Sequence, residues 1–392
     1  MSMVGRATLA VILLASCSKE YGVSAIAGSE PAVNPEDFMP CGFSETAVPG
    51  MRMYDCNPVF EATEEMWFSD TPESATMKTG SVGFYTNLVM GFPIYQIWYV
   101  ARLDESGDGS GGGYLDEWGL GTAVSENGVD WVAHETNPVV SARPGRWDED
   151  GINTMHITRD DANDRYVLAY QGYIFNGTNF EIGTGAAESK DGVEWTFPSA
   201  AEPLMQGVPT SDDIFISWPS AIYANESGLI TGYLSGAGMN DFGMQDEELD
   251  LYAAELTDDL SSWRVYRDPA LLAGPESYDL AAITTAAVVK LGDTLYMFYV
   301  GAEGWETIMG GARVPIRSTL NVATSTTGIT WTKHPSNPLD VDLGGKKELS
   351  GVAAQVVGDT IHLWLTDNYA ATGSDVSRRA VGYYLFNPPP GF

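Results

Sequence analysis

Short apolar runs, rich in aromatic residues, recur along the chain and are separated by turns that contain glycine and aspartate. The five clearest runs are Gln96–Tyr99, Tyr166–Tyr170, Leu229–Tyr233, Leu295–Tyr299 and Ile361–Leu365. Their last residues lie 71, 63, 66 and 66 positions apart. Strand-like runs at a nearly fixed period predict a protein built from repeated β units.

A second pattern follows these runs. The motif S-x-x-G-[VI]-x-W occurs at Ser125–Trp131, Ser189–Trp195 and Ser325–Trp331, and Leu256–Trp263 is a degenerate fourth copy. Its glycine predicts a tight turn between two strands, because such turns need a positive φ. Since the tryptophan recurs once per unit, we expect Trp131, Trp195, Trp263 and Trp331 to be core residues.

The two patterns together predict five units of about 66 residues, each with four antiparallel strands, which is a β-propeller blade. The fifth unit ends with its third strand, Arg379–Phe386. The segment Met51–Phe60 contains Cys56-Asn57-Pro58-Val59, which repeats the Asn-Pro-Val found after the first motif. We therefore expect an all-β, five-bladed propeller over residues 49–392, whose ring is closed by an N-terminal strand.

The connections predict that one face of the propeller is elaborated. The turns between first and second strands are short, as at Gly292-Asp293 and Gly358-Asp359. The segments between second and third strands are expected to be long loops at about 101–119, 234–250, 301–318 and 366–377. Long loops in a compact scaffold are usually functional.

The N-terminus has the pattern of an export signal. Met1–Ser16 carries one basic residue, Arg6, followed by an apolar stretch too short to span a bilayer. The sequence Leu14-Ala15-Ser16-Cys17 resembles the lipobox of bacterial lipoproteins, which implies that Cys17 is acylated. A plain signal peptide with an incidental cysteine is the alternative. Residues 17–48 are expected to be a tether that carries a disulfide-bearing segment.

Two cysteines remain, Cys41 and Cys56, fifteen residues apart. Export permits disulfides, so a local Cys41–Cys56 bond is expected, with two free thiols as the alternative.

The amino-acid composition argues against some classes of binding partner. The 392 residues include 20 Lys+Arg and 53 Asp+Glu, a net charge of −33, and 44% are hydrophobic. The chain can therefore bury a large core. An acidic balance argues against binding of nucleic acid phosphates and of anionic lipid headgroups.

Blades that end in S-x-x-G-x-x-W followed by Asn-Pro resemble a clan of glycoside hydrolases, the five-bladed arabinanase, xylosidase, levansucrase and invertase propellers, and their phosphorylase relatives. The resemblance covers roughly residues 50–386 and is specific for blade architecture. It implies a carbohydrate substrate and carboxylates around a central pocket.

A count of twenty residues back from Tyr170, Tyr233 and Tyr299 reaches Asp150, Asp213 and Asp279. These aspartates are the candidate catalytic residues, because clustered carboxylates shift one another's pKa and supply the acid and the base or nucleophile of a glycosidase. The alternative is that they cap strand starts or accept backbone hydrogen bonds.

The clan's catalytic trio does not map onto this chain. Lys78-Thr79-Gly80 stands where an early Asp is expected, and no Glu precedes Pro219 in Ile216-Ser217-Trp218-Pro219. Trp147, Trp218 and Trp305 are candidate substrate-binding residues, because aromatic rings stack on sugars; packing between blades is the alternative for each.

The sequence thus predicts an exported, lipid-anchored, monomeric propeller that acts on an oligo- or polysaccharide by glycosidase chemistry. A non-catalytic surface propeller that binds glycan or protein is the alternative, and whether the chain is an enzyme is left open. We expect no cofactor, no metal site and no nucleic acid partner. The acidic segment Asp104–Gly109 lacks the closing glutamate of a calcium loop.

Overall fold

The structure is a computed structural model, and it describes residues 39–61, 77–86, 93–102, 118–175, 180–198, 202–206, 214–238, 248–307, 313–341, 349–370, 377–390 and 392. The elements of this part are β-strands and one short 3-10 turn, η2 (Ser277–Asp279). No helix in it is long and apolar enough to cross a membrane. The expected leader Met1–Ser16 and Cys17 lie outside the described residues.

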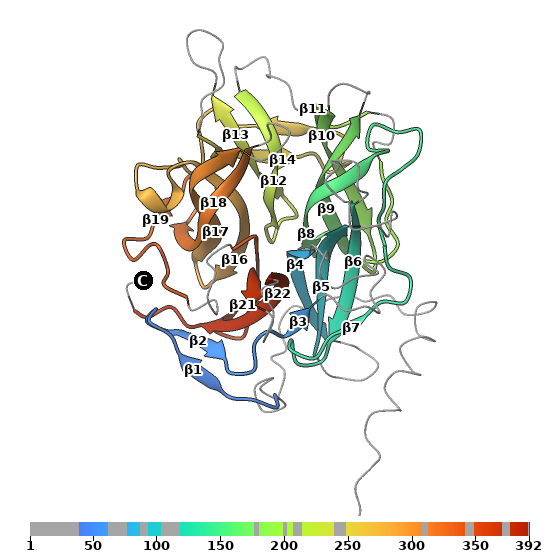
Figure 1. The fold of residues 1–392 in the computed structure, drawn as a ribbon. Helices are drawn as coiled ribbons and strands as arrows, with labels where there is room; N and C mark the ends of the chain where they lie inside the picture. Colours follow the sequence, from blue (N-terminus) through green and yellow to red (C-terminus); the bar gives the residue numbers. More distant parts are fainter. Residues whose placement is uncertain are drawn as a thin grey trace, which may run out of the picture.

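The strands form five antiparallel blades around a common centre, which confirms the predicted five-bladed propeller (Figure 1). From the inner to the outer strand, blade 1 consists of β4 (Met77–Thr86), β5 (Pro93–Arg102), β6 (Trp118–Ser125) and β7 (Val132–Ala133), and blade 2 consists of β8 (Gly151–Asp160), β9 (Arg165–Phe175), β10 (Phe180–Ser189) and β11 (Met205–Gln206). Blade 3 consists of β12 (Ile214–Ala224), β13 (Ile230–Gly238), β14 (Asp250–Leu256) and β15 (Trp263–Val265). Blade 4 consists of β16 (Ala282–Leu291), β17 (Thr294–Thr307), β18 (Arg313–Ser325) and β19 (Thr332–Lys333).

The fifth blade is completed by the N-terminal segment, as the repeat pattern predicts. Its inner strands are β20 (Gly351–Val357), β21 (Thr360–Ala370) and β22 (Ser377–Phe386). Both β2 (Met51–Tyr54) and β3 (Phe60–Glu61) pair with β22, and β1 (Phe43–Glu45) pairs with β2 at the outer edge. The inner strands β4, β8, β12, β16 and β20 contact one another in a closed circle.

Asparagines that precede proline attach the outer segment of three blades to the third strand. Asn137 accepts a hydrogen bond from Thr122 N at 2.9 Å and donates to Thr122 O at 2.9 Å. Asn337 does the same with Val322, at 2.8 and 2.9 Å. Asn57 does so with Tyr383, at 2.7 and 3.2 Å, although 326 positions separate the two residues. The ring is therefore closed by the same contact that completes an ordinary blade.

The repeated serine and glycine build the turn between the third and fourth strands. In the three full copies the serine Oγ accepts a hydrogen bond from the glycine N, at 2.8 Å for Ser125, 2.8 Å for Ser189 and 2.9 Å for Ser325. The three glycines have φ of 75–80°. In the degenerate copy Leu260 takes the glycine position with a φ of 54° and is fully buried.

These turns also join neighbouring blades. Trp98 of blade 1 donates from its indole to Gly192 O of blade 2 at 2.8 Å. Trp364 of blade 5 donates to Gly128 O of blade 1 at 2.9 Å, and Tyr233 of blade 3 donates to Gly328 O of blade 4 at 2.8 Å. Each bond satisfies a buried polar group inside the apolar layer between two blades, where an unmet donor is costly.

The hydrophobic core lies between the blades. For example, Phe298 of blade 4 packs edge-on against Phe386 of blade 5, with ring centroids 5.7 Å apart and planes at 85°. Val352 and Leu363 belong to the same buried cluster. Each blade thus buries both faces of its sheet against a neighbour, which is why the strands read as apolar runs.

The structure differs from the sequence predictions at two segments. The expected tether ends earlier than residue 48, because Phe43–Glu45 is strand β1 and the Phe43 ring packs against Tyr54 and Tyr383. The expected loop 301–318 is largely strand, since β17 and β18 continue as a paired hairpin to Thr307 and Arg313. Cross-strand pairing between β17 and β18 holds this segment extended.

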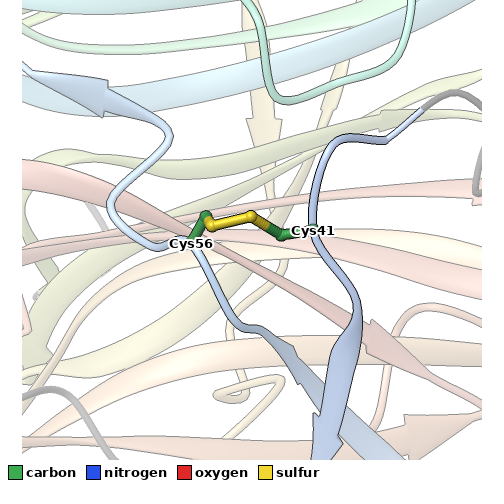
Figure 2. Close-up of a disulfide and its surroundings, with 2 residues drawn as sticks. All are labelled: Cys41 and Cys56. Carbon is green, nitrogen blue, oxygen red and sulfur yellow. A yellow bond between two sulfur atoms is a disulfide. The ribbon is translucent and has the colours of Figure 1, made fainter.

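Cys41 and Cys56 form a disulfide that closes a loop around the β1–β2 hairpin (Figure 2). The two Cα atoms are 5.9 Å apart. The bond therefore fixes the hairpin that supplies the outer strands of blade 5.

We predict that the double variant Cys41→Ser, Cys56→Ser is less stable by about 3 kcal/mol, because a closed loop of this length restricts the unfolded chain. The free energy of unfolding can be measured in urea for both proteins, with and without a thiol reductant. The reductant should destabilise the wild type and leave the double variant unchanged. Equal unfolding midpoints for the oxidised wild type and the variant would contradict the prediction.

Candidate functional site

The inner strands of blades 1 to 4 are irregular near their beginnings. Their pairing with the second strand shifts between Thr79 and Ser81, Ile152 and Met155, Ile216 and Trp218, and Ile283 and Thr285. Bulges re-aim side chains and are common next to active sites. The inner strands begin on the face that is expected to carry the long loops. The candidate site therefore lies at these strand beginnings.

Strand pairing corrects the alignment of the candidate aspartates. The turn between β8 and β9 contains four residues, whereas the equivalent turn in blade 4 contains two. A count from the closing tyrosine is therefore displaced by two positions. Ile152 pairs with Gly172 as Ile283 pairs with Gly301, and four residues before these isoleucines lie Asp148 and Asp279.

Side-chain contacts support this equivalence. A Cβ added to Gly172 would meet the Cβ of Asp148 at 2.5 Å, and one added to Gly301 would meet the Cβ of Asp279 at 2.6 Å. Each glycine is thus required by the close approach of the aspartate. Asp148, and not Asp150, is the partner of Asp279 in the repeat.

Asp148 is fully buried and completely bonded. Arg143 Nε lies 3.2 Å from Oδ1 and 2.9 Å from Oδ2, and Arg143 Nη2 lies 2.7 Å from Oδ2. The hydroxyl of Tyr170 donates to Oδ2 at 3.1 Å. Burial and the Asp148 charge raise the pKa of Tyr170 above its ordinary value, so this hydroxyl remains a donor.

Asp279 has the same role in blade 4. Its carboxylate is fully buried, and its Oδ2 accepts from Tyr299 at 2.9 Å and pairs with Lys333 Nζ at 2.6 Å. Burial raises its pKa, and Lys333 and Tyr299 act in the opposite direction. Lys333 also donates to Gly274 O at 2.6 Å, so it links the segment between blades 3 and 4 to the outer strand β19.

The cation comes from a different element in each blade. Lys333 stands two residues after Trp331, and the equivalent residue after Trp195 is Phe197. In blade 2 the guanidinium of Arg143 supplies the charge instead and lies 4.1 Å from the centre of the Phe197 ring. The ion pair is present in both blades although its source differs, which marks it as a structural requirement of the buried aspartate.

The three candidate aspartates therefore differ in burial and in their contacts. Asp279 is fully buried and ion-paired with Lys333. Asp150 is half-buried, and its N donates to Tyr173 O at 3.3 Å. Asp213 lies outside the described residues, as does the Asp104–Gly109 segment.

The candidate tryptophans also separate into two kinds. Trp147 stacks on Tyr170 with ring centroids 5.6 Å apart and planes at 17°, so it packs within blade 2. Trp218 and Trp305 are half-buried and pack against one apolar cluster of Ala237, Leu249, Ala282 and Ala302. The structure thus brings Trp218 and Trp305 together and places Trp147 elsewhere.

The repeat tryptophans are core residues, as expected. Trp331 is buried, and Trp131, Trp195 and Trp263 are half-buried against the clusters between blades. His362 is packed as well. Its Nδ1 lies 2.6 Å from the Tyr383 hydroxyl, and burial, with a smaller contribution from Arg52, lowers its pKa to about 3.

Asp148, Arg143 and Lys333 are not among the residues that the sequence predicts for the site. Asp148 could have been found by aligning the blades on the start of the inner strand, where the aspartate stands four positions before an isoleucine in both blades. Among the described residues, no group of three or more His, Cys, Asp or Glu could hold a metal ion.

Comparisons with known proteins agree with the fold. No protein-family model and no curated protein matches the chain. A solved structure described as a glycoside hydrolase is similar at a TM-score of 0.57 and 14% identity, and the similarity covers 80% of this protein and 88% of that one.

Two further solved structures are also similar. A thermostable family-43 glycoside hydrolase has a TM-score of 0.55 and 13% identity, and the similarity covers 81% of this protein and 92% of that one. A β-1,2-mannobiose phosphorylase from Listeria innocua has a TM-score of 0.55 and 12% identity, with 86% and 96% covered. These similarities show that the chain has the propeller fold of glycoside hydrolases and phosphorylases.

We predict that Asp279→Asn lowers the free energy of unfolding by about 3 kcal/mol, because it leaves the Lys333 ammonium without its carboxylate in a buried setting. Asp268→Asn, the same change at an exposed aspartate, should cost less than about 1 kcal/mol. Urea unfolding of the two variants beside the wild type measures both values. Equal losses would show that the ion pair has no special structural role.

Proposed function

We propose that the protein recognises carbohydrate on the face where the inner strands begin. The observation that carries this proposal is the five-bladed propeller itself, whose inner strands are bulged at that end and whose solved structural neighbours are described as glycoside hydrolases and phosphorylases. Half-buried aromatic rings near the start of the inner strands are suited to sugar rings.

Binding without hydrolysis is the version that the geometry favours. A glycosidase needs two carboxyl groups that reach the substrate from opposite sides. Asp279 and its equivalent Asp148 are both enclosed and held by cations. Of the three aspartates that the sequence proposes, Asp150 and Asp213 then remain as candidates for hydrolysis.

Hydrolysis remains the second candidate, and one observation favours it. Asp150 is half-buried directly before the bulged start of β8, at the position where an acid could meet a ligand. In this version one of Asp150 and Asp213 is the general acid and the other is the base or nucleophile.

The test is a screen of the purified protein on plant and microbial polysaccharides, with binding and release of reducing ends measured on the same panel. Binding without release is the expected result, and Asp150→Asn should then leave affinity within about threefold, since it keeps the shape of the side chain. Release that disappears in both Asp150→Asn and Asp213→Asn would establish hydrolysis. If no polysaccharide binds or is cleaved, the proposal is wrong.

We also propose that the protein is exported and held to a membrane by a lipid on Cys17. The leader pattern and the Leu-Ala-Ser-Cys sequence support it. The Cys41–Cys56 disulfide supports export, since such bonds persist outside the reducing cytoplasm.

We predict that Cys17→Ser moves the protein from the membrane fraction to the soluble fraction, because one acyl-bearing residue supplies the anchor. Cell fractionation and mass measurement of the mature N-terminus check this, with Ser18→Ala as the matched control. A Cys17→Ser protein that stays in the membrane fraction would exclude the anchor.

A further inference from the structure

Blades 3 and 4 are joined by backbone hydrogen bonds in addition to side-chain packing. Leu249, directly before β14 of blade 3, donates from its N to Ala281 O at 3.0 Å. Its carbonyl accepts from Ile283 N, on β16 of blade 4, at 2.9 Å. The side chain of Leu249 lies in the same apolar cluster that Trp218 and Trp305 contact. The seam between these two blades is therefore a rigid support for both rings.

Trp218 is held in one orientation at this seam. It lies on the inner strand β12, next to the register shift between Ile216 and Trp218. Its indole Nε1 donates to Thr284 O on β16 at 2.7 Å, and Ser220 Oγ donates to the same carbonyl at 3.2 Å. Because an indole has a single donor, its polar edge is fully used inside the protein. What this half-buried side chain can offer a ligand is its ring face.

Trp305 comes from a hairpin that extends past the blade. The last residue of β17 that pairs with β16 is Ala302, and beyond it β17 pairs with β18 alone, as far as Thr307. Trp305 lies three residues past that point, roughly 10 Å further along the strand. Figure 1 shows β17 and β18 side by side in blade 4, as their pairing requires. This half-buried ring thus stands at the end of the seam where the inner strand β16 begins.

Charge restricts the ligand. On this hairpin Arg317 of β18 pairs with Glu303 of β17 at 3.2 Å, and Glu306 is balanced in number by Arg313, so the hairpin carries no net charge. The net charge of the whole protein is −33, and this overall field disfavours an acidic polysaccharide.

We infer that Trp218 and Trp305 form an aromatic subsite at the seam of blades 3 and 4, and that this subsite binds neutral pyranose units through the apolar faces of their rings. The inference rests on the proposed carbohydrate recognition and adds to it a location and a ligand class. Trp147 is not part of the subsite, because its face is covered by Tyr170.

The test uses the complete protein and two variants, Trp305→Ala and Trp218→Phe, with Trp147→Phe as the matched control. Neutral mannan and xylan oligosaccharides and acidic polygalacturonate are titrated by calorimetry. Trp305→Ala should weaken binding of a neutral oligosaccharide by about tenfold, the scale of one lost aromatic contact. Trp218→Phe should weaken it less, since a ring remains but its hydrogen bond to Thr284 is lost. The control should bind as the wild type does.

A second measurement does not depend on the variants' folding. Oxidative footprinting of the wild type, with and without a saturating neutral oligosaccharide, should show protection of Trp218 and Trp305 and none of Trp147. Binding with protection elsewhere, or preference for polygalacturonate, would overturn the subsite and leave carbohydrate recognition standing. Absence of binding to every glycan would overturn carbohydrate recognition itself, and the subsite with it.

Discussion

The ring of blades depends on one contact between the two ends of the chain. Asn57 bonds to both backbone groups of Tyr383, and β2 and β3 pair with β22 on either side of it. Without these bonds β22 would be an open sheet edge, and blade 5 would lack its outer strands. The inner strand of the same blade, β20, lies between β4 and β16 in the circle whose strand beginnings form the candidate site.

A second constraint acts within blades 2 and 4. A carboxylate at the entrance to the inner strand is fully enclosed, and a tyrosine hydroxyl and a cation compensate for its loss of hydration. Removing one member of such a group destabilises the protein more than replacing the whole group by apolar residues, because the remaining charge stays buried. This explains why the cation persists in both blades while its position changes from Arg143 to Lys333. Both carboxylates are fully shielded from solvent in this arrangement.

Much of the architecture could be predicted from the sequence because each blade repeats the same local physics. The serine-glycine turn, the aromatic second strand and the Asn-Pro segment are short-range patterns, and Leu260 shows that even a degenerate copy keeps the turn. The missing fourth strand of blade 5 and its replacement by Met51–Phe60 followed from counting strands. These features need no knowledge of how distant residues meet.

The candidate site could be predicted only in part, because it depends on register and on contacts between blades. Because the β8–β9 turn has two extra residues, a count of twenty positions back from Tyr170 reaches Asp150 instead of Asp148. The exchange of Lys333 for Arg143 involves residues from different segments, and no single-sequence pattern reveals it. Trp218 and Trp305 are 87 positions apart, and only strand pairing at the blade 3 and blade 4 seam brings them together.

The disulfide has a mechanical consequence. A pulling force applied to the chain before Cys41 passes through the sulfur–sulfur bond directly to Cys56, so the residues between them carry no load. The strand β2 lies inside this loop, and its pairing with β22 is therefore shielded from tension. The first non-covalent bonds to bear the force are those of Asn57 with Tyr383. A propeller tethered by its N-terminal segment would thus resist shear at the one blade whose strands come from both ends of the chain.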